Sequence, residues 1–151
     1  MAIPFSAIQD ISEDMPRKEL DDLLQESGLA ATGGEGIATR YYGIYGPGRL
    51  LAAAGLEIHA PAGLLRSLIT RPGYRGQGLA ARLEGHVTEQ AASLGLTSIY
   101  LLTQTARDYF LARGYTPVSR EEAAPLIGRS AQFTRLCPAT AALLHKTLTT
   151  P

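Results

Sequence analysis

The sequence predicts an α/β domain, in which six or seven strands form a mixed, mostly antiparallel sheet flanked by about four helices. The length of residues 1–151 corresponds to one such domain. Three observations lead to this fold class. Residues 37–70 hold apolar stretches separated by turns too short to contain a helix, which is typical of antiparallel hairpins. From residue 79 the apolar spacing becomes helical, and an apolar stretch follows that helix directly, as in a parallel crossover.

The first 36 residues predict a short strand, a helix and a loop. Residues 1–9 are expected to form the strand. The helix begins after Ser12, with Pro16 suited to its first turn, and Gly28 ends it. Its apolar side is marked by leucines at helical spacing: Leu20, Leu23 and Leu24. Residues 32–36 are rich in glycine and are an expected loop.

Three predicted strands follow, at residues 37–45, 49–59 and 64–70. The first is rich in aromatic and β-branched residues, which suit a pleated surface. Gly-Pro-Gly at 46–48 and Ala-Pro-Ala-Gly at 60–63 supply the turns between the strands. The middle of the sequence is therefore expected to form two adjacent hairpins.

The next helix begins at residue 79 and ends at Gly95. One of its faces is apolar and consists of Leu79, Leu83, Val87, Ala91 and Leu94. Residues 96–103 are a predicted buried strand, so a right-handed β-α-β crossover is expected. A short helix with Tyr109 and Phe110 then ends at Gly114.

The last part of the chain predicts two strands and one helix. Residues 115–118 and 141–148 are the predicted strands. Ser119 and Glu122 have the spacing of a capping box, which predicts a helix start between those strands.

The composition excludes several classes of function. The chain has 14 basic and 14 acidic residues, so no overall charge favours nucleic acid or an anionic membrane surface. No apolar run approaches the ~20 residues of a membrane span, and the first residues lack the basic flank and apolar core of a secretory signal. The one cysteine, Cys137, excludes an intramolecular disulfide and fits a reducing compartment. A cytoplasmic protein is expected.

Residues 73–80 join a predicted strand to a predicted helix and contain three glycines. Glycines let successive backbone N–H groups face one way, and the helix start adds unpaired N–H groups and the positive end of its dipole. The stretch therefore predicts an anion site for a phosphate or pyrophosphate.

Three phosphate-binding patterns share features with this loop. Gly73 and Gly78 have the spacing of a P-loop, but Leu79 follows where that pattern requires lysine. Residues 76–81 match the dinucleotide fingerprint, but no carboxylate occurs at 96–104, where an acidic residue about 20 positions on is needed. The third pattern, [QR]-x-x-G-x-[GA], is met by residues 75–80.

This third match makes the sequence resemble the GNAT superfamily of N-acetyltransferases. The resemblance extends over nearly the whole length, through residues 68–78 and the aromatic-x-x-x-Gly-aromatic end at 110–115. A narrower resemblance, to the arsenic-resistance-associated branch, rests on four blocks at 55–57, 64–68, 100–103 and 132–138. That branch is related to amino-acid acetyltransferases such as N-acetylglutamate synthase.

The resemblance implies acetyl-CoA as cosubstrate and a small-molecule amine as acceptor. Substrates expected of the narrower branch are an amino acid or an amino-acid-like toxin such as an organoarsenical. A general amino-acid acetyltransferase and a weakly catalytic CoA-sensing module are the alternatives. Many members form dimers, so the resemblance also implies a homodimer, but no interface residues are assigned. By position, the main chain that would hold the cosubstrate belongs to Leu68, Ile69, Thr70, Arg75, Gly76, Gln77, Gly78, Leu79 and Ala80.

The expected catalytic residues depart from the superfamily pattern at one position. Many members use a tyrosine four residues before the late glycine to protonate the departing thiolate, and here that position is Phe110. Tyr109 is adjacent but is expected to point about 100° away around a helix. Thr103 is therefore the candidate proton donor, with Gln104, Thr105, water or direct protonation from solvent as alternatives.

Glu57 and Arg66 are the candidate base and substrate-binding residues. They lie on neighbouring predicted strands joined by a short turn, so they are expected to be close together. An ion pair that only holds two strands is the alternative interpretation. If Arg66 instead binds a substrate carboxylate, a bidentate contact is expected from guanidinium geometry.

The remaining conspicuous residues predict no metal site. The three histidines, His59, His86 and His145, show no metal-ligand spacing. His59 is the one near the predicted site, where it is a second candidate for the base. Cys137 is expected to pack or to line the pocket.

Overall fold

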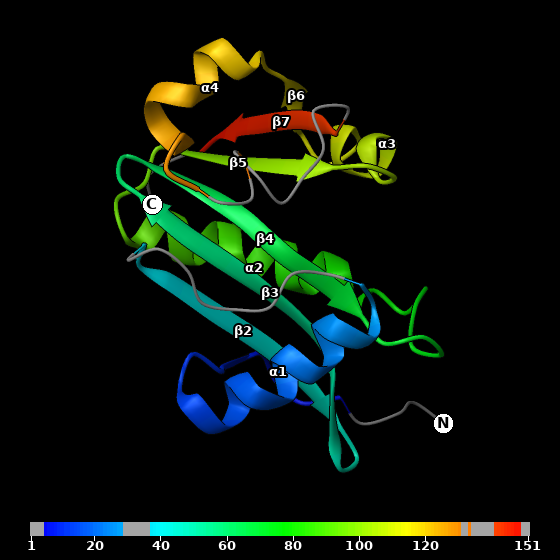
Figure 1. The fold of residues 1–151 in the computed structure, drawn as a ribbon. Helices are drawn as coiled ribbons and strands as arrows, with labels where there is room; N and C mark the ends of the chain where they lie inside the picture. Colours follow the sequence, from blue (N-terminus) through cyan, green and yellow to red (C-terminus); the bar gives the residue numbers. More distant parts are fainter. Residues whose placement is uncertain (1–4, 29–36, 131–132, 134–140, 149–151) are drawn as a thin grey trace.

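The computed structural model describes residues 5–28, 37–130, 133 and 141–148, and the structural statements below concern these residues. They form a seven-stranded sheet with strand order β1-β2-β3-β4-β5-β7-β6, together with four helices (Figure 1). The predicted fold class, a mixed and mostly antiparallel sheet with about four helices, is confirmed.

The first half of the chain forms the antiparallel part of the sheet. Its elements are β1 (Gln9–Asp10), α1 (Asp14–Glu26), β2 (Thr39–Gly46), β3 (Arg49–His59) and β4 (Ala62–Thr70). Successive strands β2, β3 and β4 pair antiparallel, as the two predicted hairpins require. The first strand is shorter than predicted, and residues 1–4 lie outside the described part. Gly28 has φ 74°, a left-handed conformation suited to ending α1.

The second half contains the parallel pair and the short elements. They are α2 (Leu79–Ser93), β5 (Ser98–Thr103), α3 (Arg107–Leu111), β6 (Thr116–Pro117), α4 (Arg120–Ile127) and β7 (Ala142–Thr147). Strand β5 runs parallel to β4, as the helix between them predicted. The capping box is present, since the Ser119 side chain accepts a hydrogen bond from the Glu122 backbone N–H at the start of α4.

The helices cover both faces of the sheet. Alternate strand residues such as Leu56, Leu65 and Leu101 point to the face covered by α2, in a cluster with Leu83 and Val87. The neighbouring residues point the other way and pack against α1 near β2 and β3 and against α4 near β4, β5 and β7. Figure 1 shows α2 behind the sheet and α1 in front of it.

A buried polar cluster connects α2 to the part of the sheet that contains β7 and β6. Glu84 of α2 is 6% exposed and accepts hydrogen bonds from Lys146 Nζ at 2.5 Å, Thr88 Oγ1 at 2.9 Å and the Tyr115 hydroxyl at 3.0 Å. Lys146 lies on β7, and Tyr115 lies between α3 and β6. The cluster therefore ties the helix that follows the glycine loop to two other elements.

Strands β4 and β5 separate along their length. Their pairing covers only Ala62–Leu64 against Ser98–Tyr100. Beyond that point β4 continues along β3, while β5 continues along β7. The two strands therefore present unpaired edges to each other over the rest of β4, and a cavity lies there.

Candidate active site

The cavity between the separated strands has a volume of about 600 Å³, within the range of small-molecule sites. One wall is β4, from Leu64 to Thr70. The opposite wall is formed by residues 101–106 together with Tyr109 and Phe110 of α3, and Ala80 closes one end. Most of the lining side chains are apolar, so this cavity, called the apolar cavity here, suits the uncharged part of a ligand.

A second cavity of about 630 Å³ adjoins the first at the carboxyl end of β4. The two cavities share Leu68–Thr70 of β4, Ala80, Thr105 and Tyr109 of α3. The second cavity, called the loop cavity here, is lined mainly by the glycine loop and the start of α2, and it also contains Arg75 and Arg113.

The glycine loop has the geometry that an anion site needs. Gly73, Gly76 and Gly78 have φ values of 94°, 77° and 83°, a left-handed conformation that side chains rarely adopt. Gly78 is the N-cap of α2, and the first turn of the helix has no acidic residue. The unpaired N–H groups and the positive end of α2 therefore meet the loop cavity without a competing carboxylate.

Eight of the nine predicted cofactor residues line one or both cavities, and Gln77 is the exception. Arg75 also lines the loop cavity, where its Nε donates to the Thr70 carbonyl at 3.2 Å. Arg71 points elsewhere, because its Nε donates to the Leu50 carbonyl at 3.0 Å and its guanidinium lies 3.4 Å from Glu26. An apolar cavity that adjoins a cationic loop and a helix N-terminus is suited to a ligand with an uncharged chain and an anionic end.

A β-bulge interrupts β4 beside the apolar cavity. Ala53 pairs with Ile69 and Gly55 with Arg66, so two residues of β4, Ser67 and Leu68, lie opposite one residue of β3. Ser67 has φ 57°, the left-handed region that a serine occupies at a cost. Bulges leave a main-chain group outside the ladder and redirect the neighbouring side chains.

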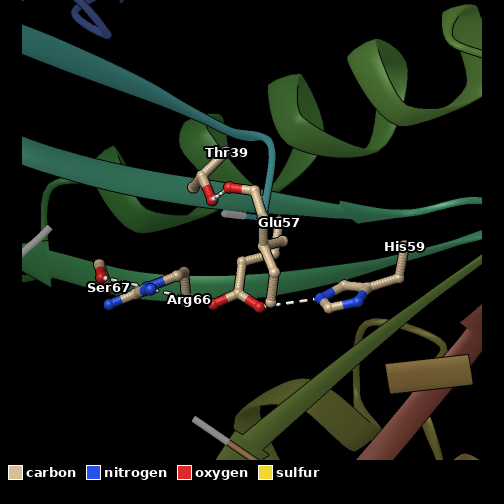
Figure 2. Close-up of polar contacts among 6 residues, drawn as sticks. Thr39, Glu57, His59, Arg66 and Ser67 are labelled. Atoms are coloured by element: carbon tan, nitrogen blue, oxygen red, sulfur yellow. Dashed lines mark hydrogen bonds and ion pairs between the residues drawn. The ribbon is translucent and has the colours of Figure 1, made fainter. Parts of the chain in front are cut away.

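Figure 2 shows Glu57 with its carboxylate between two partners, Arg66 and His59. The Arg66 guanidinium donates to Glu57 Oε2 at 2.9 Å, and Arg66 Nε donates to Ser67 Oγ at 3.2 Å. His59 Nε2 lies 2.9 Å from Glu57 Oε1. Glu57 is 2% and Arg66 7% exposed, and of these three residues Arg66 lines the apolar cavity.

The environment of Glu57 keeps it ionised. Burial by itself raises the pKa of Glu57, but hydrogen bonds from His59 and Ser130 and the charge of Arg66 bring the pKa below its ordinary value. A carboxylate can only accept, so His59 Nε2 carries the hydrogen of the shared bond. The cluster joins β3 and β4 on the face of the sheet opposite α2.

The α3 side of the apolar cavity contains Thr103, Tyr109 and Phe110. Thr103 Oγ1 accepts a hydrogen bond from the Ala106 N–H at 3.0 Å, which leaves its O–H as a donor. Phe110 is buried and packs against the ring of Tyr115 at 5.5 Å between centroids. The Tyr115 hydroxyl donates to Glu84, away from the cavity. Tyr109, the neighbour of Phe110 in α3, lines both cavities.

The sequence matches the model of the acetyltransferase (GNAT) family over residues 6–115, most of the chain. The chain belongs to the GNAT family of acetyltransferases. The family is described as one of acetyltransferases.

Solved structures share this GNAT fold at low sequence identity. N-acetylglutamate synthase from Neisseria gonorrhoeae, complexed with coenzyme A and N-acetyl-glutamate, is 18% identical with a TM-score of 0.75; 99% of this chain covers 36% of that one. Rv2747 from Mycobacterium tuberculosis, whose structure contains CoA, is 13% identical with a TM-score of 0.72, over 95% of this chain and 100% of that chain. The ribosomal-protein-S18-alanine N-acetyltransferase from Escherichia coli is 15% identical with a TM-score of 0.68, over 96% and 95%. The chain thus spans about a third of the N-acetylglutamate synthase.

Two further properties concern the described residues of this GNAT protein. They contain no group of three or more potential ligands placed to hold a metal ion. Within the same residues, none of the helices has the length and apolar character to cross a membrane. Cys137 lies outside the described part of the chain.

Sequence reasoning missed three features of this GNAT site. The bulge at Ser67 has no local marker, since serine does not signal a left-handed conformation. The hydrogen bond between His59 and Glu57 depends on two side chains on one strand, two positions apart, which therefore share a face. Arg113 was visible only as part of the motif 110–115, and its place in the loop cavity depends on how α3 packs.

Proposed function

We propose that this GNAT protein acetylates the α-amino group of a small amino acid or an amino-acid-like compound. The observation that carries the proposal is the guanidinium of Arg66, which is buried in the wall of the apolar cavity and oriented by Glu57. The planar fork of arginine matches the two oxygens of a carboxylate. An amino acid offers that carboxylate next to the amine that reacts.

One protein that shares the fold supports an acceptor of this class. N-acetylglutamate synthase is named for the acetylated amino acid that it makes. Within the class, the resemblance to the arsenic-resistance branch favours amino-acid-like toxins, including organoarsenical amino acids, as substrates to be tested first. A general amino-acid acetyltransferase is the alternative within the same chemistry.

The reaction places two demands on the residues around the cavity. Acetyl-CoA, when bound, supplies a thioester whose carbonyl carbon bonds to the amine nitrogen while the carbon–sulfur bond breaks and the thiolate leaves. A free amino group is mostly protonated near neutral pH and must lose a proton before it attacks. A proton acceptor is needed on the acceptor side, and a donor is needed beside the sulfur.

Glu57 is the proposed residue that acts near the amine. It has two roles, to orient Arg66 and to take part in proton transfer with His59. Its charge orients Arg66, and its other carboxylate oxygen orients the imidazole of His59 through their shared hydrogen bond. The contacts that lower the pKa of Glu57 make it a weak base by itself, so we assign the proton to the His59–Glu57 pair, reached through water. Glu57 thereby acts on the acceptor through its two neighbours, as the carboxylate of a catalytic triad does.

Thr103 is the proposed donor to the leaving thiolate. Its hydroxyl oxygen accepts from the Ala106 N–H, which leaves its proton to donate, and Thr103 lines the cavity together with Phe110. The amide hydrogen bond polarises the hydroxyl in the direction that favours donation. The bulge at Ser67 lies across the cavity, where a main-chain N–H outside the ladder suits the carbonyl oxygen of the thioester.

The test compares amino acids with their α-amides, using release of free thiol from acetyl-CoA as the readout. An amide removes the carboxylate and makes the amine less basic, so protonation cannot explain a lower rate with the amide. We expect kcat/KM to be at least about tenfold higher for the free amino acid, the value of one charge-assisted contact. Equal rates for acid and amide would contradict the carboxylate contact.

Single substitutions test which side chain is responsible for the preference for a free carboxylate. In Arg66→Lys the charge stays but the planar fork is lost, so KM for the amino acid rises about tenfold or more while KM for acetyl-CoA stays unchanged. Arg71→Lys is the matched control, because Arg71 lies at the end of β4 with its side chain bonded to Leu50 and Glu26 outside both cavities. Glu57→Gln is expected to lower kcat, because it removes the charge that orients Arg66 and His59.

One result would favour a CoA-sensing module over an enzyme of amino acids. This result is tight binding of CoA without turnover of any amine in the panel. The observation behind this second function is Phe110, a buried residue that has no proton to donate.

A further inference from the structure

The loop cavity has an unusual charge distribution. Its lining residues include two arginines, Arg75 and Arg113, and none of them is an aspartate or a glutamate. The N-terminal end of α2 adds further positive potential. Within the described residues, no carboxylate lies at salt-bridge distance from Arg113. A site of this kind accommodates more than one negative charge.

The two arginines approach the cavity from different elements. Arg75 belongs to the glycine loop, and its Nε is held by the Thr70 carbonyl. Arg113 follows α3, which carries the wall of the cavities opposite β4. The backbone N–H groups of the loop and α2 suffice for one compact anionic group, and Arg75 lies beside them. Arg113 is therefore placed to bind a second anionic group of the same ligand.

Tyr109 holds Arg113 in place. The guanidinium carbon of Arg113 lies 4.4 Å from the centroid of the Tyr109 ring, a cation–π contact between residues one helical turn apart. Tyr109 in turn meets Phe110 edge to face, with 5.1 Å between the ring centroids. Since the face of the guanidinium is covered by the ring, its N–H edge is the part that remains to bind, and less rotamer entropy is lost on binding.

We propose that Arg113, braced by Tyr109, binds the 3′-phosphate of CoA and makes the protein selective for CoA over dephospho-CoA. CoA carries a pyrophosphate and a separate phosphate on its ribose. The glycine loop takes the pyrophosphate, and Arg113 pairs with the remaining dianion through charge-assisted hydrogen bonds. The inference concerns the cosubstrate alone and does not depend on which amine is acetylated.

The test is the affinity of the full chain for CoA and for dephospho-CoA, measured by titration calorimetry at one salt concentration. Wild-type protein is expected to bind CoA at least about tenfold tighter than dephospho-CoA. Arg113→Ala is expected to bind CoA about as weakly as wild type binds dephospho-CoA, with its affinity for dephospho-CoA unchanged. Arg113→Glu is expected to reverse the preference.

Arg107→Ala is the matched control. Arg107 is the first residue of α3, the helix that Arg113 follows, and it carries the same charge, but its half-exposed side chain contacts Asp108 and lines neither cavity. It is expected to leave both affinities unchanged. Tyr109→Ala, which removes the brace, is expected to reduce the preference for CoA by a smaller factor than Arg113→Ala.

Two outcomes would overturn the proposal. The first is equal affinities of wild type for the two ligands, and the second is an unchanged preference for CoA in Arg113→Ala, including the case in which both affinities fall by the same factor. No amine is present in the titration. A negative result in the titration therefore does not bear on the proposed amino-acid acceptor, and a lack of turnover with every amine does not bear on the proposed role of Arg113.

Discussion

At the scale of single residues, Gly78 combines two requirements in one position. It is the N-cap of α2 and has φ 83°, and a Cβ placed on it would have no atom within 4 Å. Glycine is therefore needed there for its backbone conformation rather than for space. The same conformation directs the N–H groups at the start of α2 toward the loop cavity.

The first prediction is that Gly78→Val weakens CoA binding at least tenfold. A β-branched residue resists the left-handed conformation by about 1–2 kcal/mol, so the loop shifts and the N–H groups lose their common direction. Affinity for CoA and thermal unfolding are the measurements. Gly85→Ala is the control, since Gly85 lies within α2 with open space around it, and this change is expected to stabilise the helix by about 0.5–1 kcal/mol. Unchanged affinity in Gly78→Val would contradict the assigned cosubstrate site.

At the scale of elements, the position of α2 depends on Glu84. Burial raises the pKa of Glu84, but the hydrogen bond and charge of Lys146, with bonds from Thr88 and Tyr115, bring the pKa below its ordinary value of 4.5. Burial, followed by the Glu84 carboxylate, raises the pKa of Tyr115, so its hydroxyl stays a donor. Helix α2 is thus fastened to β7 by an ionised pair.

The pH dependence of unfolding tests this contact. Since the pKa of Glu84 is lower in the folded state, its stabilising contribution is complete above about pH 4.5 and is lost as the pH falls through the folded pKa. At pH 7, Glu84→Gln is expected to lower the free energy of unfolding by about 1–3 kcal/mol, and the difference from wild type shrinks below pH 4.5.

Glu89→Gln is the control for this experiment, because Glu89 is exposed on the same helix. It is expected to change the free energy of unfolding by less than about 0.5 kcal/mol. If the difference between Glu84→Gln and wild type did not depend on pH, the ionised pair would not be the source of the stabilisation.

At the scale of the whole molecule, the sheet consists of two parts joined by a short parallel pairing. Strands β2, β3 and β4 pair over most of their lengths, whereas β4 and β5 share only three residue pairs. Beyond Leu64 the edge of β4 lines the apolar cavity. We expect the pantetheine arm to pair with Leu68 and Thr70 as an added strand would.

Amide hydrogen exchange tests this arrangement. Addition of CoA is expected to slow exchange at residues 65–70 of β4 and 101–106 after the parallel pairing, since both segments line the apolar cavity. The interior of β2, which is already paired with β1 and β3, is the internal control. Slowing confined to α1, or equal slowing in β2, would contradict insertion of the cosubstrate between β4 and β5.

Most elements were predictable because their signals are local. The hairpins around 46–48 and 60–63 follow from proline and glycine turns, and α2 follows from a helical period that Gly95 ends. The first strand was predicted poorly, since Gln9–Asp10 belong to the sheet only through their pairing with β2. A two-residue exposed strand has no pattern of its own.

The glycine loop and the start of α2 were determined by the sequence alone, because glycine conformations and a helix start are properties of adjacent residues. The nearness of Glu57 and Arg66 was also predictable, since one short turn joins their strands. Tertiary structure decided the separation of β4 from β5, the bulge at Ser67, and the approach of Arg113 to the loop cavity. These features arise from contacts between elements distant in the chain, and no local residue pattern encodes such contacts.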